Sequence, residues 1–307
     1  MTTSVPAARR VLVTGASGLI GSALVPALGR AGWDVWRVVR RAPASERDVA
    51  WNPTTATLAP LPQPLAAVVN LAGEPIATRW TASRRRRVLE SRVGLTRALS
   101  SALAALAAPP AVLVSGSAVG WYGDRGDEIL DEASGPGGGF LAEVARAWED
   151  ATAAACGRMR VAIARFGVVL APSGGALEPL ARLTRFGVGG PLGSGRQWMP
   201  WIALDDAVSA LLHVIDRDAL AGPVNVVAPE AVRQQDLARA LGRVLHRPSL
   251  VPTPRWALRV ALGAMADGML LGSQRVVPRR LVDSGFRFRL ADLDQALRAV
   301  LAPEHAA

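Results

Sequence analysis

Apolar runs of strand length alternate with amphipathic stretches along most of this 307-residue chain. The apolar runs lie at 11–14, 32–39, 65–73, 111–114, 161–165 and 223–227, with a further short one near 49–51. Apolar residues recur at helical spacing in 19–28, 81–107, 140–155, 205–213, 234–245 and 293–300. Strands that alternate with helices in this way predict an α/β fold, a Rossmann-type doubly wound parallel sheet. The regular alternation of strand and helix patterns ends after residue 170, and we expect a small substrate lobe toward the C-terminus.

The first apolar run leads into a turn with glycines at 15, 18 and 21, and a helical pattern starts directly after it. Such glycines allow a sharp turn, a close approach of the backbone to a pyrophosphate, and tight packing of helix on strand. The anion would lie on the helix N-terminus, where free N–H groups and the dipole favour it. The flanking strand and helix favour a dinucleotide site over a simple tight loop. Its predicted contacts are Thr14, Gly15, Ser17, Gly18, Leu19, Ile20 and Gly21.

The second predicted strand ends in Arg40 and Arg41. At this place in a dinucleotide-binding fold a carboxylate binds the 2′-OH of NAD, whereas arginine accommodates the 2′-phosphate of NADP. Asp34 lies too early, in the turn before the strand. We therefore expect NADP(H), with Arg40 and Arg41 holding the phosphate. The alternative is that both are ordinary surface charges.

Two segments follow later strands at the edge where ligands bind in open α/β sheets. The small-residue turn 71–73 lets a cofactor lie close, and its predicted contacts are Leu71, Ala72 and Gly73. The polar loop 115–128 carries Ser117 and Tyr122, which we interpret as candidate catalytic residues. The alternative is a structural turn whose aromatic side chains cover the core.

Glycines break up the segment 170–201, which ends in clustered aromatic residues. This pattern favours a lid that closes over the sheet, with Gln197, Trp198 and Trp201 as candidate substrate contacts. Packing of the tryptophans in the core is an equal alternative.

The composition bounds the class of protein. With 50% hydrophobic residues, the chain can bury one large core or a core and a lobe. Its single cysteine, Cys156, excludes a disulfide framework, and no secretory pattern is visible, so we expect a cytoplasmic protein. The best candidate for a membrane span, 256–271, is broken by Arg259 and Asp267, which favours an amphipathic or packed helix.

The formal net charge is +10, and all 35 basic residues are arginine. The dense run 84–87 precedes apolar residues at helical spacing, which predicts a solvated helix face rather than a phosphate-binding patch. We do not expect nucleic acid as a partner, because no feature other than the positive net charge favours one. No metal site is expected. The oligomeric state is open, with a homodimer as one expectation.

Several motifs together carry a family resemblance. They include Thr14-Gly-Ala-Ser-Gly-Leu-Ile-Gly21, Val69-Asn-Leu-Ala-Gly-Glu-Pro-Ile76, Ser91-Arg92-Val93, Gly120-Trp-Tyr-Gly-Asp124, Trp148-Glu149, Arg165-Phe-Gly-Val-Val-Leu170 and Gly193 to Ile202. With them, the chain resembles the extended short-chain dehydrogenase/reductase superfamily, in particular its atypical "epimerase family protein" group, which is similar to NAD-dependent epimerases/dehydratases. The tail, with Gln274-Arg275 and Gly285-Phe-Arg-Phe288, resembles the C-terminal domain of unknown function in that group.

The resemblance implies an NADP-binding domain over 1–246, which includes the lid, and a C-terminal domain over 247–307. It also implies cofactor contacts by Glu74, Arg92, Ser115 and Arg165.

The family's usual enzymes use a serine and a Tyr-x-x-x-Lys pair for proton transfer. Ser117 matches the serine, but Phe140 and Val144 stand where the tyrosine and lysine are expected, and Arg92 replaces an asparagine. Tyr122 is the only tyrosine of the chain, and there is no lysine. The standard proton-transfer groups are therefore missing.

Two functions remain as hypotheses. The first is an NADP(H)-dependent oxidoreductase or epimerase for a small polar substrate, such as a nucleotide sugar, with Tyr122 as proton donor near Ser117. In that case Asp127 or Glu128 is a candidate base, and Arg165 or Arg196 a candidate anchor for an anionic substrate. The second is a catalytically inactive NADPH-binding regulatory or scaffold protein.

Overall fold

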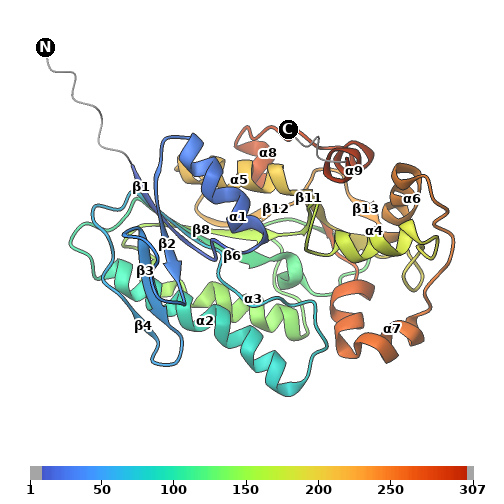
Figure 1. Ribbon diagram of the computed structural model, residues 1–307, viewed down its shortest axis with the longest axis horizontal. Helices are drawn as coiled ribbons and strands as arrows, with labels where there is room; N and C mark the ends of the chain where they lie inside the picture. The colour runs from blue at the N-terminus through green and yellow to red at the C-terminus, as the bar shows by residue number, and fades with distance from the viewer. Residues whose placement is uncertain (1–8, 303–307) are drawn as a thin grey trace, which may run out of the picture.

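A twisted eight-stranded sheet forms the centre of the molecule in the computed structural model, which describes residues 9–302 (Figure 1). Its strand order is β12-β8-β6-β5-β1-β2-β3-β4, and every neighbouring pair is parallel except β3 and β4. The strands are β1 Arg10–Thr14, β2 Asp34–Val39, β3 Asp48–Asn52, β4 Thr57–Leu58, β5 Ala67–Asn70, β6 Val112–Ala118, β8 Arg160–Phe166 and β12 Gly222–Val226. Strands that follow β1 in the chain lie on both sides of it, so the connections run in opposite directions from the point between β1 and β5. Open α/β sheets bind ligands at such a point. The predicted doubly wound α/β fold is confirmed.

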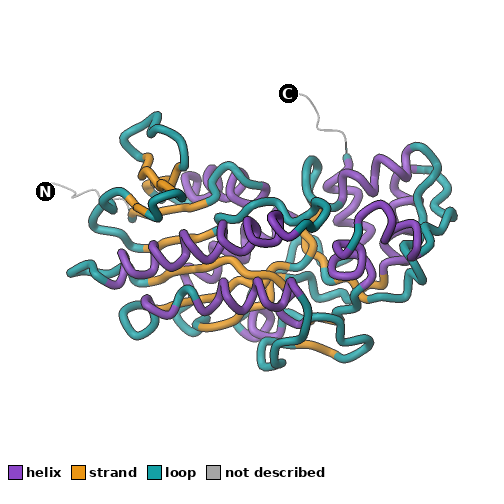
Figure 2. The backbone as a smooth tube through the Cα atoms, turned by 90° about the horizontal axis from the view of Figure 1, so that it is seen from below, coloured by secondary structure: helices purple, strands orange, loops and turns teal. Residues whose placement is uncertain are grey.

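Helices cover both faces of this sheet. Helices α1 (Leu19–Arg30) and α5 (Leu204–Asp216) pack together on one face, and α2 (Ala82–Ala104) and α3 (Phe140–Asp150) cover the other. Figure 2, seen from the side of α2 and α3, shows helices running along the strands. Val11 and Val13 face α1, whereas Leu12 faces α2, so β1 is buried on both sides.

A smaller lobe lies beyond the carboxyl ends of the strands, on the right of Figure 1. Its main apolar core is built from α4 (Leu177–Arg185), α6 (Gln234–Leu245), α9 (Leu293–Leu301) and short strands. These strands are β9 Val168–Leu170, β10 Trp198–Met199, β11 Trp201–Ala203 and β13 Val232–Arg233. The lobe therefore combines α4 and α6, which precede residue 246, with α9, which follows it. The division at 246/247 stays a sequence-based prediction.

The C-terminal segment returns from the lobe to the sheet. Strand β14 (Arg275–Val276) pairs with β7 (Ile129–Leu130), and Leu281 of α8 (Arg279–Asp283) belongs to the main sheet core. Phe286 and Phe288 pack against the same core. The short helices η1 (Val119–Tyr122) and η2 (Ala153–Ala155) complete the sheet domain.

The stretch 256–271, expected as one amphipathic or packed helix, forms two helices. Helix α7 (Arg255–Leu262) ends at Gly263, whose φ of 63° breaks the helix, and a π-helical turn, η3 (Ala266–Leu271), follows. Among the helices of residues 9–302, none combines the length and apolarity that crossing a bilayer requires.

Candidate dinucleotide and proton-transfer site

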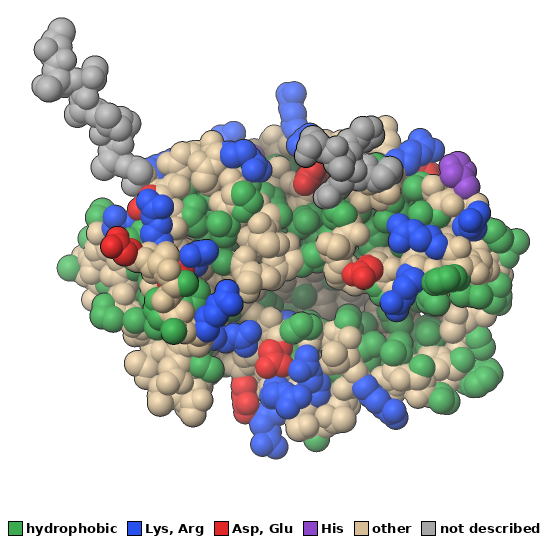
Figure 3. Space-filling view, in the orientation of Figure 1, with side chains coloured by type: hydrophobic (Ala, Val, Ile, Leu, Met, Phe, Trp, Pro, Cys, Tyr) green, Lys and Arg blue, Asp and Glu red, His purple; other side chains and the backbone are tan. Residues whose placement is uncertain are grey.

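The space-filling view shows a hollow between the sheet domain and the lobe (Figure 3). The carboxyl ends of the central strands face the lobe here, and most of the predicted site residues lie along this edge.

The glycine turn between β1 and α1 has no room for side chains at two positions. Gly15 has a φ of 68°, and a Cβ there would lie 2.6 Å from the carbonyl oxygen of Leu71. A Cβ at Gly21 would overlap the carbonyl oxygen of Gly15. Helix α1 begins after Gly18 without a side-chain cap and with no acidic residue in its first turn. Its first N–H groups are therefore free for an anion, as the sequence predicts.

A buried polar cluster holds the turn 71–73 beside the glycine turn. Thr14 donates through Oγ1 to Oδ1 of Asn70 at 2.6 Å, and accepts the N–H groups of Leu71 and Ala72, both at 3.1 Å. Asn70 in turn donates to Ser115 Oγ at 3.2 Å. The cluster brings together five residues predicted to contact a cofactor: Thr14, Gly15, Leu71, Ala72 and Ser115.

Two further predicted elements flank the glycine turn. Arg40 and Arg41 are exposed directly after β2, in which Val38 is the register partner of Thr14. On the other side, a Cβ at Gly175 would lie 3.1 Å from the side chain of Leu19. The start of the predicted lid thus rests on the first turn of α1.

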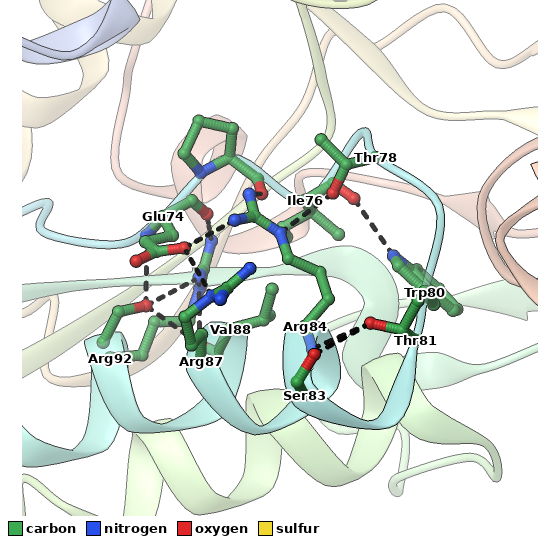
Figure 4. A network of polar contacts seen from close by, with 12 residues as sticks. Glu74, Ile76, Thr78, Trp80, Thr81, Ser83, Arg84, Arg87, Val88 and Arg92 are labelled. Atoms are coloured by element: carbon green, nitrogen blue, oxygen red, sulfur yellow. Dashed lines mark hydrogen bonds and ion pairs between the residues drawn. The ribbon is translucent and has the colours of Figure 1, made fainter.

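Glu74 and Arg92 follow the turn 71–73, in a network of arginines shown in Figure 4. The Glu74 carboxylate binds Arg84 at 2.8 Å and lies 4.0 Å from Arg87. Arg92 instead donates to the Glu74 carbonyl oxygen at 3.0 Å.

Ser117, at the end of β6, contacts a carboxylate that sequence reasoning did not assign. Its hydroxyl donates to Glu149 Oε1 at 2.6 Å. Arg165 binds both oxygens of the same carboxylate, from Nε at 2.9 Å and from Nη2 at 2.8 Å. Strand register explains the arrangement, because Ser117 and Arg165 are partners in β6 and β8, and Glu149 comes from α3 on the face that they share.

Tyr122 lies behind Arg165, with no exposed surface. Its hydroxyl donates to Asn225 Oδ1 at 2.7 Å and accepts Nη1 of Arg165 at 3.1 Å. Burial raises the pKa of Tyr122. The structure brings Tyr122 into one network with Ser117 through Arg165 and Glu149, and buries its side chain.

The network continues to Glu132, whose Oε1 accepts the N–H of Asn225 at 3.0 Å and the N–H of Arg280 at 3.3 Å. Glu132 is 8% exposed, its Oε2 has no hydrogen-bond partner within residues 9–302, and burial raises its pKa.

The candidate substrate contacts have separate positions. Trp201 is completely buried in the lobe core and donates to the carbonyl oxygen of Glu230, and Gln197 donates to the carbonyl oxygens of Leu192 and Leu270. Trp198 is partly exposed between the guanidinium groups of Arg233 and Arg275.

One of the two candidate bases contacts this tryptophan. Asp127 accepts the Trp198 indole N–H at 2.7 Å, and Glu128 pairs with Arg125 at 2.6 Å. Arg196 is exposed. None of the hydrogen bonds or ion pairs within residues 9–302 joins Asp127, Glu128 or Arg196 to Ser117.

Comparison with known proteins now decides the family. Residues 11–227 match the NAD dependent epimerase/dehydratase family, and residues 253–300 match a domain of unknown function, DUF1731. The chain belongs to the NAD-dependent epimerase/dehydratase family. The resemblance seen in the sequence is thereby confirmed.

Relatives within this family match almost end to end. An epimerase family protein of Mycobacterium bovis is 43% identical over 290 residues, which are 94% of this chain and 96% of the relative. The crystal structure of human epimerase family protein SDR39U1 (isoform 2) with NADPH has a TM-score of 0.89 at 33% identity, covering 95% of this chain and 99% of the human one. A nucleoside-diphosphate sugar epimerase from Corynebacterium glutamicum has a TM-score of 0.80 at 36% identity, covering 96% of this chain and 58% of the other.

Proposed function

We propose that this protein is an NADP(H)-dependent oxidoreductase or epimerase-like enzyme for a small polar substrate, with Ser117 and Glu149 as its proton-transfer pair. The observation that carries this proposal is the 2.6 Å hydrogen bond from Ser117 to Glu149, at the sheet edge that also holds the glycine turn. The single Cys156 supports a cytoplasmic setting.

The residues of the glycine turn fit a dinucleotide. A Cβ at Gly15 or Gly21 would fill the space beside the turn, and the first turn of α1 offers free N–H groups without a competing carboxylate. Arg40 and Arg41, which are exposed directly after β2, would hold a 2′-phosphate, and the crystal structure of human SDR39U1 contains NADPH. When bound, the nicotinamide supplies or accepts a hydride.

Ser117 and Glu149 would move the proton. Because the Ser117 hydroxyl donates to Glu149, its oxygen can accept a hydrogen bond from a substrate hydroxyl. A proton leaving that hydroxyl passes to Ser117 Oγ, while the Ser117 proton passes to Glu149. Arg165 fixes the carboxylate with two hydrogen bonds, so the receiving oxygen stays in place.

One observation favours the second function, an NADPH-binding protein without catalysis. Val144, which stands at the lysine position, is 4% exposed, and the ring of Phe140, at the tyrosine position, packs against Trp80 with centroids 4.9 Å apart. Neither position offers an acid or a base.

The first test is calorimetric titration with NADPH and then NADH. We expect tighter binding of NADPH, and a loss of that preference in Arg40→Ala/Arg41→Ala. Absence of binding by both nucleotides would reject this function and its non-catalytic alternative together.

The second test separates an enzyme from a binding protein. With sugar nucleotides and small ketones as substrates, Glu149→Gln is expected to lower turnover by about 10²–10⁴ while NADPH affinity stays within about twofold of wild type. Glu143→Gln, on the exposed side of the same helix, is the control. Tyr122→Phe tests Tyr122 as the proton donor. If Tyr122 is catalytic, this variant should stay folded and lose turnover. Turnover unchanged in Glu149→Gln would remove the role proposed for that carboxylate.

A further inference from the structure

Arg92, in the middle of α2, is a buried guanidinium without a carboxylate partner. Its side chain is 6% exposed, and no ion pair within residues 9–302 includes it. Nη1 donates to the Val88 carbonyl oxygen at 3.1 Å and Nη2 to that of Glu74 at 3.0 Å, whereas Nε has no hydrogen-bond partner in the described part of the chain. Burial lowers its pKa to about 10, so the group is still charged at neutral pH.

The nearest carboxylate, that of Glu74, is bound by other arginines. Arg84 contacts it at 2.8 Å and Arg87 at 4.0 Å, as Figure 4 shows. Arg165, the other buried arginine at this edge, is neutralised by Glu149 at 2.8 Å. Unlike Arg165, Arg92 forms no ion pair with a carboxylate of residues 9–302, and the charge of Glu74 acts on it only from beyond ion-pair distance.

This charge lies directly behind the turn 71–73. A Cβ on Gly73 would be only 2.8 Å from Cζ of Arg92, so the guanidinium is packed against the turn backbone. The same turn is held by Thr14 next to Gly15, which starts the glycine turn. Arg92 therefore lies just beneath the surface beside the helix N-terminus that offers free N–H groups.

A buried charge without a counter-ion is costly, because desolvation is not offset by an ion pair. The two carbonyl contacts, the Ser91 hydroxyl oxygen 3.5 Å from Nη1, the Trp148 ring 5.1 Å away and the charge of Glu74 compensate only in part. In such a weakly screened place an anion on the other side of a glycine backbone interacts strongly with the guanidinium.

We propose that Arg92 is the buried counter-charge for a diphosphate laid across the turn 71–73, and that the dinucleotide supplies this diphosphate. The inference rests on the proposed NADP(H) binding, and gives Arg92 a role distinct from the surface clamp by Arg40 and Arg41. A diphosphate on the substrate has the same chemistry and is the competing source.

The test compares Arg92→Met, which removes the charge, with Arg92→Lys, which keeps it. Arg87→Met, on an exposed position of the same helix, is the matched loss of one positive charge. Calorimetry measures the Kd of NADPH and of inorganic pyrophosphate, and thermal unfolding without ligand monitors the fold. We expect Arg92→Met to weaken both ligands about 10–100-fold, Arg92→Lys to restore most of the affinity, and Arg87→Met to change it by about twofold or less. The unfolding midpoint of Arg92→Met without ligand should equal or exceed that of wild type.

Three results would overturn the inference. Affinities in Arg92→Met that match those in Arg87→Met would make Arg92 a purely structural residue. Equally weak binding by Arg92→Lys would show that shape, not charge, matters. If pyrophosphate binds in an Arg92-dependent way but does not compete with NADPH, the diphosphate that Arg92 binds belongs to the substrate and not to the dinucleotide. Failure of the proposed function alone gives a different result, in which the wild type binds pyrophosphate in an Arg92-dependent way but does not bind NADPH. A wild type that binds neither ligand rejects both the proposed function and the inference about Arg92.

Discussion

At the scale of single residues, the glycine turn gives the sharpest expectation. Gly21→Ala places a Cβ on the Gly15 carbonyl oxygen, so we expect a loss of about 1–3 kcal/mol in the free energy of unfolding. The turn must shift to make room, so NADPH affinity should fall by about tenfold or more. Urea denaturation and calorimetric titration measure the two effects.

Gly29→Ala is the control in the same helix. A Cβ at Gly29 meets no atom within 4 Å, so this change should stabilise the protein by up to about 1 kcal/mol. Equal effects of the two substitutions would contradict the steric explanation.

Glu132 predicts a pH dependence of stability. Because burial raises its pKa in the folded protein above the ordinary value of 4.5, the folded state binds this proton more tightly than the unfolded state. The resulting stabilisation is present below pH 4.5 and is lost as pH rises through the folded value. Glu132→Gln should remove this loss. Urea denaturation at several pH values measures it, and parallel curves for variant and wild type would show that Glu132 does not titrate in this way.

The role of a single residue could be predicted from the sequence only where that role depends on its neighbours along the chain. The roles of Thr14, Gly15 and Gly21 follow from local spacing, because strand, turn and helix are contiguous. Glu149 reaches Ser117 from 32 residues away through helix packing and strand register, which no motif states. The same long-range packing buries Tyr122, although its loop is polar in sequence.

At the scale of elements, the sheet strands and main helices follow the predicted order, because both faces of the parallel strands are buried and leave continuous apolar runs. The short strands β4, β7 and β14 have no such run, since each has only two residues. Their pairing depends on tertiary contacts that periodicity does not show.

Helix α8 protects the edge strand β12 through Arg280. Arg280, at its start, donates to the carbonyl oxygens of Ala219 at 3.1 Å and Pro223 at 2.7 Å, and to that of Ala221. Arg280→Met leaves these carbonyls without a charged donor, so we expect a loss of about 2 kcal/mol in stability. Arg279→Met removes an exposed ion pair with Asp131 and should cost less than about 1 kcal/mol. Chemical denaturation of both variants tests the difference, and similar losses would reject this role of Arg280.

At the scale of the whole molecule, the lobe and the sheet are joined by chain segments that cross in both directions. Leu281, Phe286 and Phe288 complete the sheet core, while α9 packs on α6 in the lobe. The sequence division at 246/247 follows the resemblance of the tail to a separate domain, and it cannot show this interleaving.

We therefore expect that a chain ending at residue 246 does not fold on its own. It would expose apolar surface on the sheet and on α6, so the fragment should aggregate or lack a cooperative thermal transition. The full chain should unfold in one transition. A fragment that unfolds cooperatively and binds NADPH as tightly as the full chain would establish 1–246 as an independent domain.

The buried arginine also restricts how this sequence can change over evolutionary time. Val144 and Trp148 lie one helical turn apart on the buried side of α3, and the Trp148 ring already faces Arg92. Phe140→Tyr with Val144→Lys would restore the family's usual pair, but would add a second buried cation beside the first. Val144→Lys is therefore expected to lower the stability of the folded chain as long as Arg92 is present.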